Sequence, residues 1–272
     1  MSLAQRLAII QSATSGLRPR DIPIAFGSWR PDVETYPNPG LVTAKGVYRL
    51  SPQSYAPMPL HNPTSDALDT YARGAIAVRD TSAAVYMYAG NETKLYSLSA
   101  STWADASKSG GYTTGSGERW SFTRFINTIV ATNYADAVQT VTIGSSPFAD
   151  LITSTLKPKA RYATTINNFL VLGNTVDGTD GTVPNRVWWS AIGDAADFDP
   201  DASTQCDFNN IPEAGAVQNV LGGRQYGLVF CEDRIYRMNY AGPPTVFDFY
   251  PLDYTRGAPI PHSVVGHGQM AF

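Results

Sequence analysis

Apolar and polar residues alternate along most of the chain after Arg73, with the two-residue period of half-buried β-strands. Residues 137–143 show this alternation most clearly. Shorter runs, such as 85–89 and 226–231, end in Gly, Asn, Asp or Glu, and the first three of these favour tight turns. The pattern therefore predicts a long series of antiparallel strands joined by short turns.

The strands recur in groups, and the group that ends in an aromatic strand shows the order best. Residues 163–173 predict a strand, an Asn-Asn turn and a second strand. A polar loop follows, and then an aromatic strand containing Trp188 and Trp189, which closes at Gly193 and Asp194. Similar groups begin near Arg73, near Trp120 and near Val217.

Five residues mark the second strand of successive groups. The spacings between them are about 44, 41, 58 and 42 residues, and the residues are Val85, Ile129, Leu170, Leu228 and Met270. The long interval contains a loop at 177–183 and an acidic insert at 197–210. A period of about 40–50 residues with up to four strands is typical of propeller blades, which bury their faces by stacking. We therefore predict an all-β fold, a β-propeller-like repeat of four-stranded antiparallel blades over residues 73–272.

The fifth group, from His262 to Phe272, contains only two predicted strands. Either another segment completes this blade, as in propellers that close by sharing one, or the chain is part of a longer one. The apolar run 270–272 favours the second alternative, because an exposed apolar strand edge is prone to pair with other chains. We therefore expect the propeller-like domain to be incomplete at its C-terminus.

Residues 1–72 are predicted to form an N-terminal helix and an extended arm. Leu3, Leu7 and Ile10 have helical spacing, which predicts a helix over 3–13. Eight prolines between Pro23 and Pro63 each fix φ and remove a backbone donor, so this stretch is expected to be extended and largely unpaired. Its aromatic residues need apolar cover from the same domain or a neighbouring subunit, and they include Trp29, Tyr36, Tyr48 and Tyr55.

Composition narrows the possible functions. The formal net charge is -3 and charged residues make up 16% of the 272 residues, below the usual roughly 25%. This mildly acidic balance does not support non-specific nucleic-acid binding through a basic surface. No apolar run reaches the about 18 residues of a membrane span, and the start lacks the features of a signal peptide. We expect a soluble protein made in a cytoplasm.

Possible metal ligands are sparse. His61, His262 and His267 lack an evident third ligand, and Cys206 and Cys231 lack metal-site spacing, which favours two unpaired thiols. An acidic run resembles a loose calcium loop, but it lacks the closing Glu and contains Pro200; its members are Asp194, Asp197, Asp199 and Asp201. A solvated turn is the favoured interpretation, as is a plain hairpin loop for residues 177–181.

Catalytic patterns are not evident either. Most Asp residues fall in predicted turns, where Asp is favoured for backbone reasons. The sequence contains no nucleophile elbow and no phosphate loop. We therefore predict a protein that is not an enzyme, with no catalytic residues, no metal and no cofactor.

The aromatic strand supplies the interface and structural candidates. Arg186 is expected to pair with an Asp between blades or to extend along the surface rather than to bind a ligand. Trp188 and Trp189 must point to opposite faces of their sheet. One is expected in the core between blades, and the other in the core, in an interface or in a sugar-binding platform.

Two stretches carry a resemblance to a known family. Residues 185–194, followed by Asp197 and Phe198, resemble a recurring phrase in tail proteins of tailed phages, an Arg-Val-x-Trp-Ser strand followed by a Gly-Asp turn. Residues 29–32, 36–40, 44–48 and 55–60 are similar to the N-terminal segment of those proteins. The chain thus resembles tail hub or nozzle proteins of short-tailed bacteriophages, including the packaged-DNA stabilisation proteins.

The resemblance implies a virion structural protein located in the tail. Its subunits would form a ring, commonly six-fold, below the portal and adaptor proteins, contact a tail fibre or spike, and retain and conduct genomic DNA without binding it specifically. An acidic or neutral lining, with Arg side chains mostly paired elsewhere, would let DNA slide. The alternative is a carbohydrate-binding or glycan-cleaving propeller, which a signal peptide or paired cleft carboxylates would favour.

Overall fold

The computed structural model describes residues 45–51, 54–58, 63–267, 270 and 271. Internal contacts divide the chain into two units, residues 1–63 and 64–272. The predicted helix over 3–13 lies outside the described residues, as do Trp29 and Tyr36. Residues 64–72, which the sequence assigned to the arm, group with the larger unit: Ser65 accepts a hydrogen bond from the Trp103 indole at 3.2 Å.

The smaller unit contains an antiparallel hairpin of β1 (Val47–Ser51) and β2 (Ser54–Pro57). Val47 lies opposite Pro57. The prediction of unpaired extended backbone is therefore wrong for this part of the arm. The reason is local: residues 47–51 contain no proline, and Pro57 stands at the very end of its strand, where a missing donor is tolerated.

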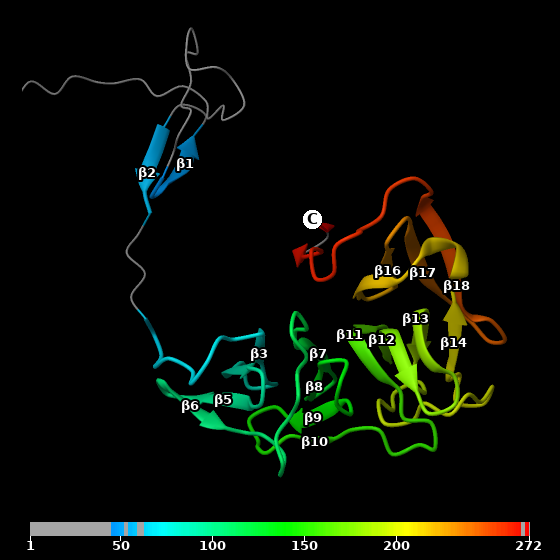
Figure 1. The fold of residues 1–272 in the computed structure, drawn as a ribbon, viewed down its shortest axis with the longest axis horizontal. Coiled ribbons are helices and arrows are strands. Elements are labelled where there is room, and N and C mark those ends of the chain that lie inside the picture. The colour runs from blue at the N-terminus through cyan, green and yellow to red at the C-terminus, as the bar shows by residue number, and fades with distance from the viewer. Residues whose placement is uncertain (1–44, 52–53, 59–62, 268–269, 272) are drawn as a thin grey trace, which may run out of the picture. The chain divides into compact units, whose positions relative to one another are not determined.

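The larger unit contains four four-stranded antiparallel sheets, and in each the strands lie side by side in chain order (Figure 1). The first sheet consists of β3 (Gly74–Arg79), β4 (Val85–Gly90), β5 (Leu95–Ser99) and β6 (Thr102–Asp105). The second consists of β7 (Ser121–Phe125), β8 (Thr128–Thr132), β9 (Gln139–Thr142) and β10 (Ala149–Asp150).

The third sheet consists of β11 (Lys159–Ile166), β12 (Phe169–Asp177), β13 (Gly181–Trp189) and β14 (Asp207–Asn210). The fourth consists of β15 (Val217–Leu221), β16 (Tyr226–Cys231), β17 (Ile235–Gly242) and β18 (Val246–Asp253). A hairpin of β19 (Gly266–His267) and β20 (Met270–Ala271) follows. Among the described residues there is no α-helix, only the 3-10 turn η1 (Pro212–Ala214). The predicted all-β class is confirmed.

The fourth strands of the first and third sheets differ from the sequence prediction. The alternation pattern placed a polar connection around Trp103 and an acidic insert over 197–210, yet β6 and β14 lie in these segments. Both strands have four residues and are mostly exposed or half-buried, so neither carries a buried apolar row. An edge strand of this kind gives no alternation signal.

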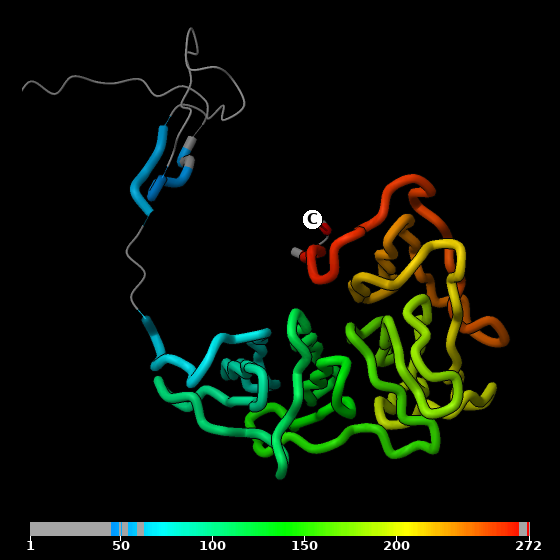
Figure 2. Tube along the Cα trace, viewed as in Figure 1, coloured from blue at the N-terminus to red at the C-terminus, as the bar shows by residue number. Residues whose placement is uncertain are grey.

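Successive sheets contact each other through their first strands, β3 with β7, β7 with β11 and β11 with β15. Hydrogen bonds join β7 to β11: the backbone N–H of Ala163 donates to Ser121 Oγ at 3.0 Å, and the hydroxyls of Thr123 and Thr165 lie 3.3 Å apart. The chain trace in Figure 2 follows the same order from sheet to sheet. Each sheet is therefore a neighbour of the sheet that precedes it in the sequence.

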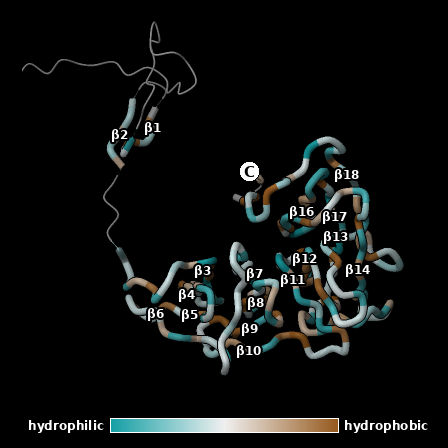
Figure 3. Tube along the Cα trace, viewed as in Figure 1, coloured by the Kyte–Doolittle hydropathy of each residue, from teal (hydrophilic) through white to brown (hydrophobic). Residues whose placement is uncertain are grey.

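Three hydrophobic cores fill the spaces between the four sheets. The first core contains Tyr88 and Leu95 from the first sheet and Ile129 from the second. The second core contains Val130, the next residue of β8, together with residues of the third sheet, namely Leu170, Leu172 and Trp188. The third core joins the third and fourth sheets and includes Phe169, Val171, Trp189, Val229 and Met238. Interior sheets thus bury both faces, because consecutive strand residues point in opposite directions. Figure 3 shows hydrophobic residues distributed along the strands of these sheets.

Two glycines allow neighbouring sheets to approach closely. A Cβ at Gly90, the last residue of β4, would overlap the indole of Trp120 just before β7. A Cβ at Gly173, within β12, would lie 2.6 Å from a methyl group of Val220 on β15. Both positions require a residue without a side chain, since a Cβ cannot approach another heavy atom this closely.

The two end sheets are covered differently from the interior ones. On the first sheet, Val85 and Met87 share one face and are both exposed, Met87 by 40%. On the fourth sheet, Phe230 is buried against Ala258 and Val264, which follow the sheet in the sequence. The hairpin contributes Ala271 to the same small cluster.

Candidate functional site

The aromatic strand β13 lies in the middle of the third sheet, between β12 and β14. Its last four residues are buried, and Trp188 pairs with Leu172 on one side and with Phe208 on the other. This strand therefore belongs to the part of the sheet that packs against both neighbouring sheets.

Trp188 and Trp189 point to opposite faces of the sheet, as strand alternation requires. Trp188 is 1% exposed in the core shared with the second sheet, and Trp189 is 3% exposed in the core shared with the fourth. The indole N–H of Trp189 donates to the carbonyl oxygen of Gln205 at 2.9 Å. Both indoles are thus core residues, and neither is accessible as an interface residue or a sugar platform.

Arg186 forms a closed network at the start of the buried part of β13. Its guanidinium lies 3.0 Å from Asp177 Oδ2 and 2.7 Å from Asp180 Oδ2, and its Nε donates to Asn210 Oδ1 at 2.8 Å. The same guanidinium stacks over the ring of Phe208, with 4.0 Å between its central carbon and the ring centroid.

The Arg186 partners belong to the same sheet, so the predicted pairing between blades is wrong. Asp177 ends β12 and Asp180 lies in the turn that leads to β13, whereas Asn210 ends β14. Since three acceptors and an aromatic ring already contact the guanidinium, Arg186 clamps one end of the third sheet.

The two arm tyrosines that the structure describes lie in the small hairpin. Tyr48 is on β1 and exposed, whereas Tyr55 is on β2 and half-buried, opposite Arg49. Arg186 and the two tryptophans belong to the other unit. Trp29 and Tyr36 remain predictions, because they lie outside the described residues.

The acidic residues between Asp194 and Asp201 accept hydrogen bonds from backbone N–H groups. Asp194 accepts the backbone N–H of Ala196, and Asp201 accepts that of Ser203. Asp199 accepts the backbone N–H groups of Leu156 at 2.7 Å and Thr155 at 2.9 Å. These hydrogen bonds lower the pKa of Asp199, because they stabilise the ionised carboxylate. The described part of the chain contains no group of three metal-ligating side chains.

Burial makes both cysteines poor nucleophiles. Cys206 and Cys231 are free thiols, and burial raises the pKa of each to about 12. Because the thiolate is the reactive form, such thiols are inert near neutral pH. Cys206 donates a weak hydrogen bond to the carbonyl oxygen of Trp189 at 3.3 Å and so contributes to the core.

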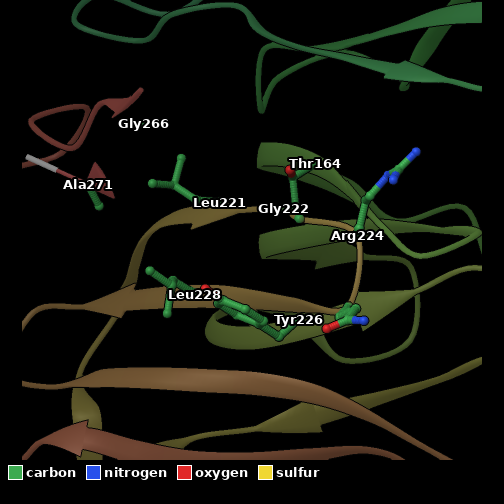
Figure 4. Close-up of a pocket in the computed structure, with 10 residues that line it drawn as sticks. Thr164, Leu221, Gly222, Arg224, Tyr226, Leu228, Gly266 and Ala271 are labelled. Atoms are coloured by element: carbon green, nitrogen blue, oxygen red, sulfur yellow. The ribbon is translucent and has the colours of Figure 1, made fainter. Parts of the chain in front are cut away.

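A cavity of about 700 Å³ lies between the fourth sheet and the final hairpin. In Figure 4, Leu221 and Leu228 face the hairpin that carries Gly266 and Ala271. Arg224 lies at the turn between β15 and β16. The described residues that line this cavity include no carboxylate, imidazole or thiol, so its walls suit packing rather than acid–base or nucleophilic catalysis.

A second cavity, of about 410 Å³, has a polar lining. It lies near the beginnings of the first strands, and its lining includes Arg73, Arg119, Tyr162, Asn219 and His262. Sequence interpretation missed it, although one signal was present: Arg73 stands one residue before β3, and Arg119 stands two residues before β7. Repeated cations at similar positions of successive repeats indicate a shared location.

In comparisons with known proteins, no family pattern and no curated protein matches the chain. Within the described residues, no helix has both the length and the apolar character that crossing a bilayer requires. Assignment of a function therefore depends on the sequence phrases, the stacked sheets and the chemistry of the side chains described above.

Proposed function

We propose that the larger unit is a β-propeller-like assembly in which each four-stranded sheet is one blade. Two observations support this arrangement. The first strands of consecutive sheets contact each other, and consecutive sheets share a hydrophobic core. In propellers the blades surround an axis lined by their first strands, and each blade packs face to face on the next. The β19–β20 hairpin would then begin a further blade.

We further propose that the protein is a structural subunit of a phage tail, a hub or nozzle protein. Its copies would form a ring below the portal and adaptor proteins and in contact with a fibre or spike. The resemblance implies that this ring has six-fold symmetry. The observation that carries this proposal is the role of the phrase 185–194 that resembles tail proteins. In this chain it supplies the core of two sheet-to-sheet interfaces and no accessible chemistry.

The proposal assigns no catalytic activity to the protein. The carboxylates of the acidic loops already accept hydrogen bonds from turns, both thiols are buried, and Arg186 is saturated with partners. The glycan-binding alternative receives no support from the two tryptophans, because stacking on a sugar requires an exposed ring face.

Native mass spectrometry and negative-stain electron microscopy of the full chain test this function directly. A ring of several copies, with six expected, would support the hub assignment, whereas a monomer at micromolar concentration would contradict it. A variant lacking residues 1–63 is expected to stay folded and soluble but to lose ring formation, because the larger unit has its own cores. The control is full-length Tyr71→Ala, a change at an exposed position of the larger unit.

Two further measurements challenge the proposed role in DNA passage. The isolated protein is expected to bind duplex DNA weakly, since a conduit that neutralised many phosphates would hold the polyanion and release counterions. Tight duplex binding that weakens steeply with salt would contradict a smooth channel. Hydrolysis of a bacterial polysaccharide, abolished by a single Asp→Asn change, would overturn the non-enzymatic assignment.

A further inference from the structure

The 410 Å³ cavity receives residues from each of the four four-stranded sheets of the larger unit and from segments next to them. The approach to β3 supplies Arg73, the approach to β7 supplies Arg119, β11 supplies Tyr162, and β15 supplies Asn219. His262 comes from the segment that follows the fourth sheet. Segments far apart in the sequence therefore converge on one hollow, which only the assembled stack creates.

The charges around this cavity leave one guanidinium free. Arg161 forms a two-pronged pair with Glu118, at 2.7 and 3.0 Å. Arg73 donates to the carbonyl oxygen of Gly115 at 2.6 Å and lies 3.2 Å from Glu92. Arg119 is exposed and has no ion-pair or hydrogen-bond partner among the described residues. It departs from the expectation that the Arg side chains are mostly paired, and it leaves the cavity with excess positive charge.

The cavity wall also contains a buried hydroxyl. Tyr162 is 2% exposed, and its hydroxyl is closed to solvent. Within the described residues the hydroxyl has no hydrogen-bond partner of ordinary geometry, although it lies towards the backbone of His262 and the side chain of Arg161. Burial raises the pKa of Tyr162 to about 12, so the hydroxyl keeps its proton at neutral pH. Buried polar groups in native proteins are nearly always paired, which makes this unpartnered hydroxyl informative.

The other polar residues of the lining already have partners. Asn219 donates its side-chain amide to the carbonyl oxygen of Val264 at 2.9 Å. His262 Nε2 lies 3.7 Å from Glu118 Oε2, and its ring centroid is 5.3 Å from that of Tyr162. These contacts hold the cavity wall in place, so the free binding capacity of the lining resides in Arg119.

We propose that this cavity binds a small anionic ligand through one carboxylate or phosphate group. Arg119 supplies the cation, because a guanidinium presents paired N–H donors that match the oxygens of a carboxylate or phosphate. Carboxylate and phosphate share this chemistry, and the cavity volume leaves room for the remainder of the ligand. The site does not depend on the proposed tail function.

Isothermal titration calorimetry on the full chain tests the site, with inorganic phosphate in one arm and acetate in the other, at constant ionic strength in chloride. We expect saturable binding of one anion per chain in at least one arm. Arg119→Ala should weaken it by about tenfold or more, the effect of losing a charge-assisted hydrogen bond. Arg119 is exposed, so folding should be unaffected, and a thermal melt checks this.

Two matched variants separate specific binding from general charge. Arg256→Ala removes the same charge at an exposed position away from the cavity lining and should leave the affinity unchanged. Tyr162→Phe removes only a hydroxyl that is closed to solvent and should leave both the affinity and the fold unchanged.

Saturation with phosphate alone would identify a phosphate-bearing ligand, and saturation with acetate would identify a carboxylate. The proposal is overturned if neither anion saturates the protein, or if Arg119→Ala and Arg256→Ala bind equally well. Neither result depends on whether the protein forms rings, so failure here would leave the tail function intact.

Discussion

At the scale of single residues, Arg186 shows why a charge can lie inside an all-β core. Its side chain is 4% exposed and that of Asp177 is 1% exposed, so the pair is almost completely removed from water. Asp180, the second carboxylate, remains 46% exposed. Removing two charges from water costs several kcal/mol per ion, and only a complete set of partners offsets this penalty.

Replacing Arg186 by Met is therefore expected to lower the free energy of unfolding by about 3–5 kcal/mol, because Asp177 would remain buried without a counter-charge. Urea denaturation followed by tryptophan fluorescence measures the change. Asp180→Asn is the matched control, with an expected loss below about 1 kcal/mol, since the Asp180 side chain is 46% exposed and does not become a buried unpaired charge. Equal losses of unfolding free energy in the two variants would show that the burial of Asp177 does not determine how much the Arg186 network stabilises the fold.

The two tryptophans allow a direct comparison, because each supports a different sheet-to-sheet core. Trp188→Ala and Trp189→Ala are each expected to cost about 3–5 kcal/mol of stability, the usual effect of truncating a buried indole. Chemical denaturation monitored by circular dichroism measures both. Tyr71→Ala, at a highly exposed position, should change stability by less than about 0.5 kcal/mol. A small loss of stability at either tryptophan would show that its indole contributes little to the core in which it lies.

The buried thiols predict a specific pH behaviour. An ordinary Cys with a pKa near 9.0 reacts faster as the pH rises from 7 to 9, because its thiolate fraction increases. Cys206 and Cys231, with pKa values raised to about 12, should stay protonated over this range. Ellman's reagent should thus label neither thiol of the native protein at pH 7 or pH 9, and both after denaturation. Native labelling that increases with pH would indicate an accessible cysteine.

At the scale of elements, the sequence predicts the first three strands of each four-stranded sheet well, but it misses the fourth strands of the first and third sheets. Residues 163–173 become β11, a turn at Asn167 and β12, because apolar residues point into cores on both faces. β14 was interpreted as part of an insert, since its sequence Asp-Phe-Asn-Asn contains one apolar residue. Phe208 pairs with Trp188 across the sheet, and such tertiary context is invisible in a short polar segment.

Close approach between elements can be tested with glycines. Gly173→Ala and Gly90→Ala should each lose about 1–3 kcal/mol of stability, because a new methyl group would meet Val220 or the Trp120 indole and force the sheets apart. Thermal unfolding measured by circular dichroism reports the loss. Gly178→Ala is the control, since a Cβ there has no heavy atom within 4 Å. If all three variants melt together, the sheets can adjust at little cost.

At the scale of the whole molecule, interior and end sheets should differ in local stability. The second and third sheets bury both faces, whereas the first sheet exposes Val85 and Met87. In a stack stabilised by neighbour contacts, the ends open before the middle. Hydrogen exchange followed by mass spectrometry should therefore show slower exchange in β8 and β12 than in β3 and β4. Uniform exchange would instead indicate that all four sheets open as one cooperative unit.

The polar cavity belongs to this scale too, which explains why the sequence did not reveal it. More than forty residues separate Arg73 from Arg119, and more than forty separate Arg119 from Tyr162, so no local motif contains them together. They meet because successive sheets place similar positions of their first strands side by side. The repeat period can be read from the sequence. Whether each side chain faces the cavity, however, depends on the strand register and on which sheets are neighbours.

The simple order of strands within and between the sheets has a consequence for synthesis on the ribosome. Hydrogen bonds between consecutive sheets join residues 42 and 43 positions apart, as in Ala163–Ser121 and Asn174–Val217. Asn219 of β15 likewise bonds to Val264, which lies 45 positions later and just before the final hairpin. Each sheet can therefore dock on its predecessor once about one further repeat of chain has emerged. Folding that proceeds sheet by sheet from the N-terminal side needs no contact with a segment distant in the sequence. The entropic cost of closing the chain between neighbouring sheets therefore stays nearly constant for every added sheet.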